Sequence, residues 1–416
     1  ATGTAWTRSP RPQSGQTPSA TPQPHCRVGV CSKKVLDNVT LVTPTGKGTE
    51  SPLITHIVGA RPNFPKAAPV IRALETAPIN QRLVHTGQHY DDALSESFFR
   101  DLKLPKPDIN LGVGSGSHAL QTAGLLTAIA TEIADNPPAL LVVYGDINST
   151  LAAALAASKL GIPLAHVEAG LRSFDRTMPE EVNRVITDQL SALLFTTSPE
   201  AVENLAKEGL DPSTIHFVGN PMIDTLLAHL DSFDAGRIQD ELGIAGGYAV
   251  VTLHRPANVD DPIMAAQLVH TLTAAAELTP LILPLHPRGR QALAAHGLLD
   301  ASTVRIVDPL GYIDFVSLVR GSRVVITDSG GIQEETTMLG VPCLTLRPNT
   351  ERPITITQGT NQLVDTTTVL QSLRECVGTG QDEKAKQRGS RPAPPLWDGR
   401  AGERIADVIR DWMQER

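Results

Sequence analysis

The feature that most constrains the fold of this chain is a regular alternation of short apolar runs and helix-like segments. Runs of this length are typical of strands buried on both faces of a parallel sheet. Because the segments between them have helical length, the pattern predicts βαβ units and therefore an α/β fold class. The predicted strands are residues 53–58, 140–145, 163–169, 192–197, 215–219, 248–254, 281–286, 304–308, 323–328 and 342–347.

The predicted strands fall into two series. The first lies within residues 52–221 and the second within residues 222–397. We expect each series to form a Rossmann-like domain with a doubly wound parallel sheet. Such sheets bind ligands at the carboxyl ends of their strands, so the two domains are expected to face each other across a cleft. A last amphipathic helix is predicted within residues 398–416.

Residues 1–51 differ from the rest of the chain in composition. Pro, Ser, Thr, Gln and Gly dominate, and the first 50 residues carry a net charge of +4 while the remaining 366 carry −12. Such a segment buries too little apolar surface to offset the entropy of ordering, so we expect a disordered extension. No apolar run follows its basic residues, which argues against a secretory signal. Cys26 and Cys31 lie near one histidine only, which disfavours a metal site.

The composition of the whole chain disfavours several classes of protein. The net charge of −8 and the pI of about 5.8 argue against a nucleic-acid binder. Four cysteines in 416 residues do not make a disulfide scaffold. No run of 18 apolar residues occurs, so no membrane span is expected. We therefore expect a cytoplasmic protein that binds neither nucleic acid nor a membrane.

Polar residues that follow the first series of strands are candidate site residues. Arg61 and Lys66 follow the first strand, where a glycine turn and two cations at a helix start suit an anionic ligand. Asp146 follows the predicted strand 140–145 and also suits a helix N-cap. Glu168 lies near the end of the predicted strand 163–169 in an apolar context, which is expected to raise its pKa. Glu180 lies at a predicted helix start, where a glutamate is favourable for the helix alone. That structural role does not explain why Asp146, Glu168 and Glu180 are all expected at one edge of the sheet.

Two residues of the second series have competing interpretations. His254 follows a strand directly and has no apolar face, which favours a site role over a core role. Phe315, in a short predicted helix, could cover a uracil ring, but core packing explains it nearly as well.

A second group in this half suits a diphosphate. Ser329, Gly330 and Gly331 open a predicted helix, whose free N–H groups and positive dipole end attract anions. An ordinary capped helix would have the same residues. Glu335 lies one turn further, where a carboxylate could accept two ribose hydroxyls. Arg352 supplies another cation for the phosphates.

Nine motifs, taken in order, resemble the bacterial UDP-N-acetylglucosamine 2-epimerase family, non-hydrolysing type. The resemblance covers about residues 53–397. The motifs are GARPNFPKAAPVIRAL, TGQHYDD, GDINST, HVEAGLRS, MPEEVNR, VGNPMIDTL, TLHRPANVDD, TDSGGIQEE and TERP.

This resemblance implies a glycosyltransferase-B-like fold, with the final helix packing back on the first domain. It also implies reversible C2 epimerisation of UDP-N-acetylglucosamine to UDP-N-acetylmannosamine, through elimination of UDP to a 2-acetamidoglucal and re-addition. Relatives are homodimers, so a homodimer is expected. No metal is needed where arginine, histidine and helix N–H groups neutralise the diphosphate. No NAD fingerprint occurs, so no cofactor is expected.

The resemblance also assigns roles to the candidate residues. Those that handle protons are Asp146, Glu168 and Glu180, and His254 either handles a proton or stabilises the diphosphate. Those that hold UDP are Arg61, Lys66, Phe315, Ser329, Gly330, Gly331, Glu335 and Arg352. The carboxylate that removes the C2 proton is not assigned.

Three departures from the family pattern stand out. Many members have HRRE where this chain has His254-Arg255-Pro256-Ala257. Many also have a second polar side chain shortly after the Gln-His of TGQH, where this chain has Tyr90-Asp91-Asp92. Such elements bind a second, activating UDP-sugar in some relatives, so we expect this protein to lack that activation. The loop between residues 172 and 179 is shorter than in many relatives, which keeps Glu181 as an alternative to Glu180.

Three other functions remain open at this stage. A hydrolysing epimerase would release UDP and free N-acetylmannosamine and shares these motifs. A glycosyltransferase of the same fold needs one base at most, which the three acids disfavour. A sugar-nucleotide-binding regulator needs no proton transfer, so this function would not explain the three acids.

Overall fold

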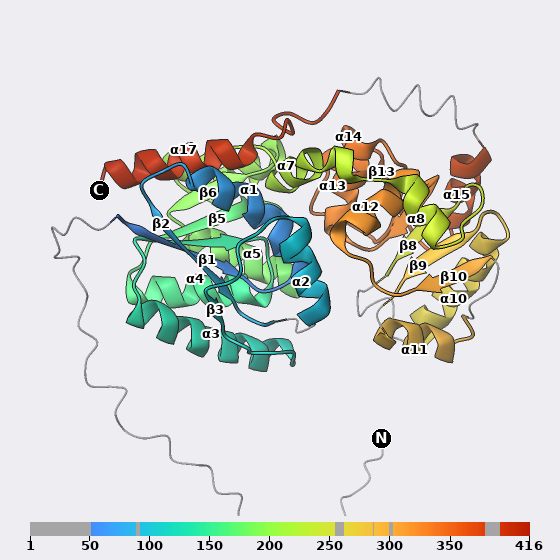
Figure 1. The fold of residues 1–416 in the computed structure, drawn as a ribbon, viewed down its shortest axis with the longest axis horizontal. Helices are drawn as coiled ribbons and strands as arrows, with labels where there is room; N and C mark the ends of the chain where they lie inside the picture. Colours follow the sequence, from blue (N-terminus) through green and yellow to red (C-terminus); the bar gives the residue numbers. More distant parts are fainter. Residues whose placement is uncertain (1–50, 89–91, 254–261, 286, 299–302, 379–391) are drawn as a thin grey trace, which may run out of the picture. The chain divides into compact units, whose positions relative to one another are not determined.

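The computed structural model describes the chain from residue 51 onwards, with short gaps. The described residues are 51–88, 92–253, 262–285, 287–298, 303–378 and 392–416. They form two separate parallel sheets with helices on both faces (Figure 1). The predicted α/β class with two doubly wound parallel sheets is therefore confirmed.

The first sheet has seven parallel strands in the order β3-β2-β1-β4-β5-β6-β7. Its strands are β1 (Leu53–Val58), β2 (Asn80–His85), β3 (Ile109–Asn110), β4 (Leu140–Tyr144), β5 (Leu164–Ala169), β6 (Leu193–Thr196) and β7 (Ile215–Phe217). Its helices are α1 (Phe64–Leu74), α2 (Asp92–Asp101), α3 (His118–Asp135), α4 (Asn148–Leu160), α5 (Pro179–Leu190), α6 (Pro199–Lys207) and α7 (Pro221–Ala228). The order has the reversal between β1 and β4 that marks the ligand side of a doubly wound sheet.

The second sheet has six parallel strands in the order β10-β9-β8-β11-β12-β13. Its strands are β8 (Ala249–Thr252), β9 (Leu281–Pro284), β10 (Val304–Val307), β11 (Val324–Thr327), β12 (Cys343–Leu346) and β13 (Asn361–Val364). Its helices are α8 (Ala235–Glu241), α10 (Pro262–Ala276), α11 (Pro287–Ala295), α12 (Tyr312–Gly321), α13 (Gly330–Leu339), α14 (Ile354–Thr357) and α15 (Val369–Gly378).

Three observed strands were missed from the sequence, namely β2, β3 and β13. The sequence of β2 is NQRLVH, and only its last three residues are buried. β13 reads NQLV, and β3 has two residues at the edge of the sheet. Edge and partly exposed strands lack the continuous apolar run that identifies a buried parallel strand.

Alternate residues of each strand pack into different hydrophobic cores on the two faces of the sheet. In β1, Ile54 and Val58 join the core that contains α1, while Ile57 packs with α3 and α4 on the other face. The same alternation in β8 directs Val251 toward α10 and Val250 toward α8 and α12. This period of two follows from the pleat and buries both faces of each sheet.

The last helix, α17 (Ala401–Gln414), packs against α1 of the first sheet (Figure 1). Ile405 and Ile409 are fully buried in the core that α1 also joins. Gly402 lies so close to Pro69 that an added Cβ would come within 2.7 Å of the Pro69 carbonyl. The close approach requires glycine at this position.

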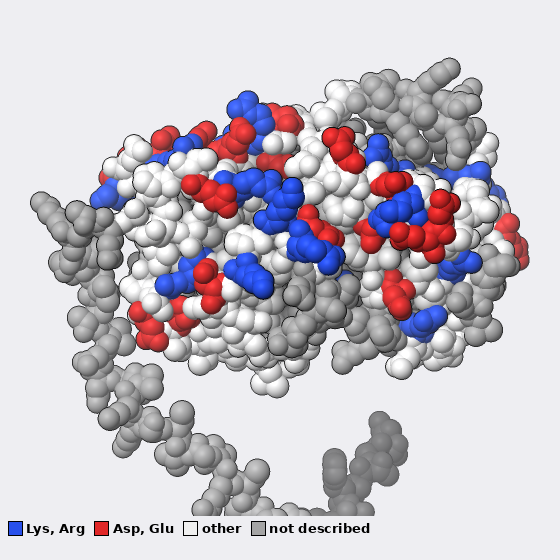
Figure 2. Space-filling view, in the orientation of Figure 1, with Lys and Arg blue, Asp and Glu red and all other residues white. Residues whose placement is uncertain are grey.

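The surface of the described residues shows no strongly charged region on the face drawn in Figure 2. There, Lys and Arg side chains lie beside Asp and Glu side chains. Among the described helices, none is both long enough and apolar enough to cross a membrane.

Candidate active site

Three of the predicted acids lie at one edge of the first sheet. Asp146 follows β4 by two residues, Glu168 is the second-last residue of β5, and Glu180 is the second residue of α5. Because β4 and β5 are neighbouring parallel strands, their carboxyl ends meet at the same edge.

Glu168 is buried between two cations. Its Oε2 is paired with the Lys66 Nζ, and its Oε1 accepts from the Arg352 Nη2 at 2.9 Å. Burial alone would raise the pKa of this carboxyl, but the charges of Lys66 and Arg352 lower it below its ordinary value. The raised pKa expected from the apolar sequence context is therefore wrong, because both cations come from segments remote in sequence.

The backbone at Glu168 is strained. Its φ is +79°, a left-handed value that is uncommon outside glycine, and the pairing of β5 with β6 shifts register between Val167 and Ala169. This bulge directs the Glu168 side chain away from the regular pleat. An added Cβ on Gly145 would lie 3.1 Å from the Glu168 Oε2, so glycine leaves room for this carboxylate.

Asp146 is held by an arginine of α5. Its Oδ2 pairs with the Arg184 Nη2 at 2.9 Å, and Arg184 is almost fully buried. The Asn183 amide donates to the Asp146 carbonyl at 2.8 Å. Two neighbouring residues of α5 therefore fix both the side chain and the backbone of Asp146.

The structure separates the two glutamates at the start of α5. Glu181 is buried and accepts hydrogen bonds from the Ser173 and Phe174 amides, the Ser173 hydroxyl and Arg184. Its oxygens are thus occupied in fixing the loop before α5. Glu180 is half-buried, and its carboxylate has no partner within the part of the chain that the structure describes. This difference favours Glu180 as the residue available to a ligand.

The turn after β1 is organised by Asn63, which the sequence analysis did not single out. Its Oδ1 accepts from the Gly59 and Ala60 amides, and its Nδ2 donates to the Tyr144 carbonyl at 2.8 Å. These contacts join the β1 turn to the end of β4. Arg61 follows this turn on the exposed surface, while Lys66 is buried against Glu168.

The predicted diphosphate group lies at the start of α13. Ser329 is its N-cap residue, and Gly330 and Gly331 are its first two residues. An added Cβ on Gly330 would come within 2.6 Å of the Glu351 Oε1 and closer still to Arg352. Glycine therefore lets Arg352 lie directly beside the helix start.

Arg352 is the most heavily paired cation described. Besides Glu168, it pairs with Glu351 and with Glu334, whose Oε1 lies 3.1 Å from the Arg352 Nε. Glu351 also pairs with Arg347 at 2.6 Å. These three acids raise the pKa of Arg352 far above its ordinary value, although burial acts in the opposite direction. Glu334 and Glu351 lie in two of the nine family motifs, but the sequence alone assigns neither residue a role.

Two further predicted residues lie near this helix. Glu335 of α13 is buried, and burial raises its pKa to about 7, with the charge of Glu334 acting in the same direction. Phe315 of α12 is half-buried and packs against two apolar cores. Phe315 therefore takes part in core packing, which the sequence offered as the alternative to contact with a uracil ring. His254 lies outside the described residues.

Comparison with known proteins identifies the family. Residues 72–410 match the family model described as UDP-N-acetylglucosamine 2-epimerase. The chain belongs to the UDP-N-acetylglucosamine 2-epimerase family. This confirms the resemblance inferred from the nine motifs.

This chain aligns with two curated members of the epimerase family over nearly the full length of each. The UDP-N-acetylglucosamine 2-epimerase of Methanocaldococcus jannaschii is 39% identical over 366 residues, which is 86% of this chain and 98% of the relative. The UDP-2,3-diacetamido-2,3-dideoxy-D-glucuronate 2-epimerase of Pseudomonas aeruginosa is 41% identical over 365 residues, covering 86% and 99%.

Solved structures of epimerases share the fold. The Methanocaldococcus jannaschii enzyme in complex with UDP-GlcNAc and UDP matches with a TM-score of 0.80 and 37% identity, covering 86% of this chain and 99% of that one. The Neisseria meningitidis UDP-GlcNAc 2-epimerase bound to UDP-GlcNAc matches with a TM-score of 0.77 and 27% identity, covering 88% and 100%. The expected glycosyltransferase-B-like architecture agrees with these similarities.

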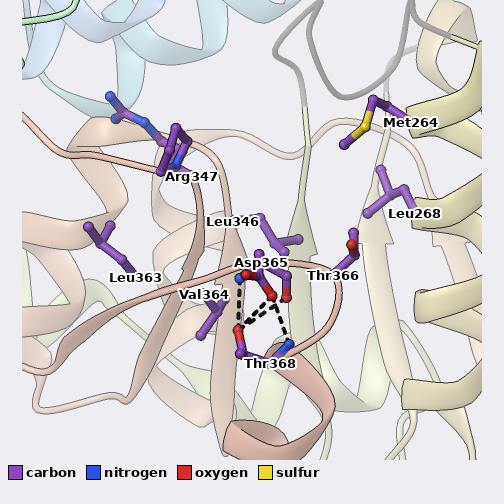
Figure 3. Close-up of a pocket in the computed structure, with 10 residues that line it drawn as sticks. Met264, Leu268, Leu346, Arg347, Leu363, Val364, Asp365, Thr366 and Thr368 are labelled. Carbon is purple, nitrogen blue, oxygen red and sulfur yellow. Dashed lines mark hydrogen bonds between the residues drawn. The ribbon is translucent and has the colours of Figure 1, made fainter.

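A pocket of about 460 Å³ lies beside the second sheet, lined by residues of α10, β12 and β13 (Figure 3). Its described lining includes Met264, Leu268 and Leu346, and none of the predicted site residues that the structure describes. Asp365 lines it too, and its Oδ1 accepts hydrogen bonds from Thr367 and Thr368. No cluster of three or more His, Cys, Asp or Glu side chains suited to a metal occurs in the described ranges.

Proposed function

We propose that this chain catalyses the reversible C2 epimerisation of UDP-N-acetylglucosamine to UDP-N-acetylmannosamine without net hydrolysis. The observation that carries the proposal is the buried contact of Glu168 with Lys66 and Arg352. It brings a candidate acid–base carboxylate together with cations suited to a diphosphate. Asp146 and Glu180 at the same sheet edge add carboxylates for a second proton transfer.

The chemistry requires this combination. The C2–H bond and the bond from C1 to the diphosphate oxygen break, a C1–C2 double bond forms, and UDP leaves with the bonding electrons. A carboxylate accepts the C2 proton, and cations together with helix N–H groups stabilise the departing diphosphate. In the return step a proton is delivered to C2 from the opposite face, UDP adds back to C1, and C2 is inverted.

The residues divide between these tasks. Glu168, Asp146, Glu180 and His254 are the candidates for proton transfer. The cations Arg61, Lys66 and Arg352 and the start of α13 would hold the diphosphate, since a helix N-terminus attracts anions. Glu335 would accept ribose hydroxyls, and Phe315 would lie against the uracil.

A second candidate substrate is UDP-2,3-diacetamido-2,3-dideoxy-D-glucuronate. The Pseudomonas aeruginosa relative named for this substrate is 41% identical over 365 residues, comparable with the identity to the Methanocaldococcus jannaschii enzyme. Its C2 chemistry is the same, and only the groups at C3 and C6 differ. Parallel assays of the two UDP-sugars at equal concentration separate these candidates.

Product analysis by NMR tests the reaction type. We expect either UDP-hexosamine to give the same equilibrium mixture of the two, with no accumulation of UDP. Stoichiometric UDP with free N-acetylmannosamine would indicate the hydrolysing reaction instead. A UDP-sugar that binds but changes only with an added acceptor would indicate a transferase, and binding without any turnover a regulator.

We further infer that the chain works as a cytoplasmic homodimer and lacks activation by a second UDP-sugar. The first follows the family resemblance and is tested by sedimentation. The second follows from Pro256 and Ala257 in place of the more common Arg-Glu. Kinetics in the UDP-N-acetylmannosamine direction should be hyperbolic, and a sigmoidal curve abolished by added UDP-N-acetylglucosamine would contradict it.

A further inference from the structure

We propose that Asp188 and His166 form a buried ion pair that positions the backbone of two candidate acids, Asp146 and Glu168. Both side chains are fully buried, with no exposed surface. They act through the strand ends that they hold and not on the sugar itself, so they are positioning residues. This inference rests on the function proposed above.

The imidazole of His166 bridges two neighbouring strands. It lies in β5, its Nδ1 is 2.6 Å from the Asp188 Oδ1, and its Nε2 is 2.8 Å from the Gly145 carbonyl oxygen. A carbonyl oxygen can only accept, so Nε2 carries a proton. An ionised Asp188 can only accept as well, so Nδ1 also carries a proton and the ring is a cation.

The second oxygen of Asp188 holds the segment after β5. Its Oδ2 accepts from the Gly170 amide at 3.1 Å and pairs with the Arg172 Nη2 at 2.7 Å. Burial alone would raise the pKa of Asp188, but the charges of His166 and Arg172 lower it. The carboxylate is therefore ionised at neutral pH, as the donor arrangement requires.

The two anchored backbone positions flank the candidate acids. Gly145 immediately precedes Asp146, and Gly170 lies two residues after Glu168. Gly145 also donates its amide to the Val167 carbonyl at 3.0 Å, next to Glu168. Because Glu168 has a positive φ, its conformation persists only where the surroundings hold it. Asp188 and His166 supply such a restraint on both sides.

Helix α5 links this pair to the remaining acids. Glu180, Arg184 and Asp188 are spaced by four residues, which places them on one face of the helix. Arg184 pairs with Asp146, and Asp188 pairs with His166. One face of one helix thus carries a candidate acid at its start and the residues that hold the other two.

The Asp188→Asn variant tests this inference because it keeps the size of the side chain and removes its charge. We expect kcat for epimerisation to fall about 10²-fold, the effect of a small misplacement of reacting groups. The affinity for UDP should not change, because the diphosphate ligands at the start of α13 make no contact with Asp188. The Glu208→Gln variant is the matched control. Glu208 pairs with the same Arg172 but contacts neither Gly145 nor Gly170, so its kcat should equal that of the wild type.

Three results would overturn the inference. An Asp188→Asn protein with normal kcat and a lower melting temperature would show a role in stability alone. Equal losses of kcat and UDP affinity would show general damage, and a fall in Glu208→Gln of the same size would show that any pair at Arg172 matters.

A measurement on the wild-type protein is independent of turnover and of variant folding. ¹⁵N NMR of the imidazoles, with the His166 signal assigned from its loss in His166→Gln, should show a proton on each ring nitrogen, as the two acceptors require. A ring nitrogen without a proton would contradict the ion pair. If the wild type forms no epimer, the proposed function fails, and this measurement still decides whether the pair exists.

Discussion

Glu168 and Arg352 form a buried ion pair, with the Glu168 Oε1 2.9 Å from the Arg352 Nη2. Glu168 is at the end of β5 in the first sheet, and Arg352 follows β12 of the second. Lys66 holds the other oxygen of the same carboxylate. A bound diphosphate would draw on both cations, so it competes with Glu168 for them. Losing its cations would make the carboxylate a stronger base.

The Glu168→Gln variant separates these two effects. We expect turnover to fall by about 10²–10⁴-fold, the usual contribution of a positioned acid or base. UDP should bind at least as tightly as to the wild type, because Lys66 and Arg352 no longer pair with a carboxylate. Steady-state kinetics and calorimetric titration with UDP measure the two quantities.

Near-normal turnover in Glu168→Gln would remove this residue from the acid–base group. Weaker UDP binding would show that the carboxylate orients the cations and does not compete with the ligand.

The buried Glu335 predicts a pH dependence of ligand binding. Its pKa is raised to about 7, so it becomes ionised only as the pH rises through this value. If the carboxylate accepts ribose hydroxyls, binding favours its ionised form and affinity rises from pH 6 to pH 8. The slower turnover expected of Glu168→Gln allows titration with UDP-N-acetylglucosamine, whose diphosphate does not titrate in this range. The rise should be lost in the Glu168→Gln/Glu335→Gln double variant, and a rise that persists there would assign it to another group.

Gly330→Ala should displace the cation at the diphosphate site. The added Cβ would lie 2.6 Å from the Glu351 Oε1 and still nearer to Arg352, so the guanidinium must move. We expect UDP affinity to fall about tenfold or more, in line with a lost charge-assisted hydrogen bond. Gly236→Ala is the control, because its Cβ would make only an ordinary contact of 3.4 Å with Asp234. Equal UDP affinity in both variants would contradict this role for Gly330.

Asp224 predicts a pH dependence of stability. It accepts from the Gly402 amide at 2.7 Å, and burial raises its pKa to about 6 from an ordinary value of 3.8. A raised pKa in the folded state stabilises the protein below the unfolded pKa, and this contribution disappears as pH rises through about 6. Asp224→Asn should therefore gain stability relative to the wild type from pH 5 to pH 8, by about 1.4 kcal/mol. Chemical denaturation at several pH values measures the difference, and a pH-independent difference would contradict it.

Residues 1–50 lie outside both the described structure and the family match. A chain that begins at Ser51 should keep the turnover of the full-length protein. Comparison of kcat and KM for the two chains measures this, and a large loss in the shorter chain would assign the segment a function.

The fold was predictable wherever strands are buried on both faces. Fully buried strands such as β4 have continuous apolar runs, and the spacing between them identified the parallel α/β class. β2 was missed because Asn80 and Arg82 interrupt its apolar pattern at the exposed end. Local sequence contains no signal for the partner strand that buries the rest of it.

The candidate site was predictable in its residue types but not in its pairings. Position at strand ends identified Asp146, Glu168 and Lys66. The pairing of Glu168 with Arg352 joins residues 184 positions apart, and no local pattern reports it. The same applies to His166 and Asp188, which the sequence presents as an ordinary strand residue and an ordinary helix residue.

Incorporation of deuterium at C2 tests the central claim most directly. In heavy water, the wild-type protein with UDP-N-acetylglucosamine should place deuterium at C2 of both UDP-hexosamines, while Glu168→Gln should place little or none. Epimer formation with the original C2 hydrogen retained, or equal incorporation by the wild type and Glu168→Gln, would contradict proton transfer through this site.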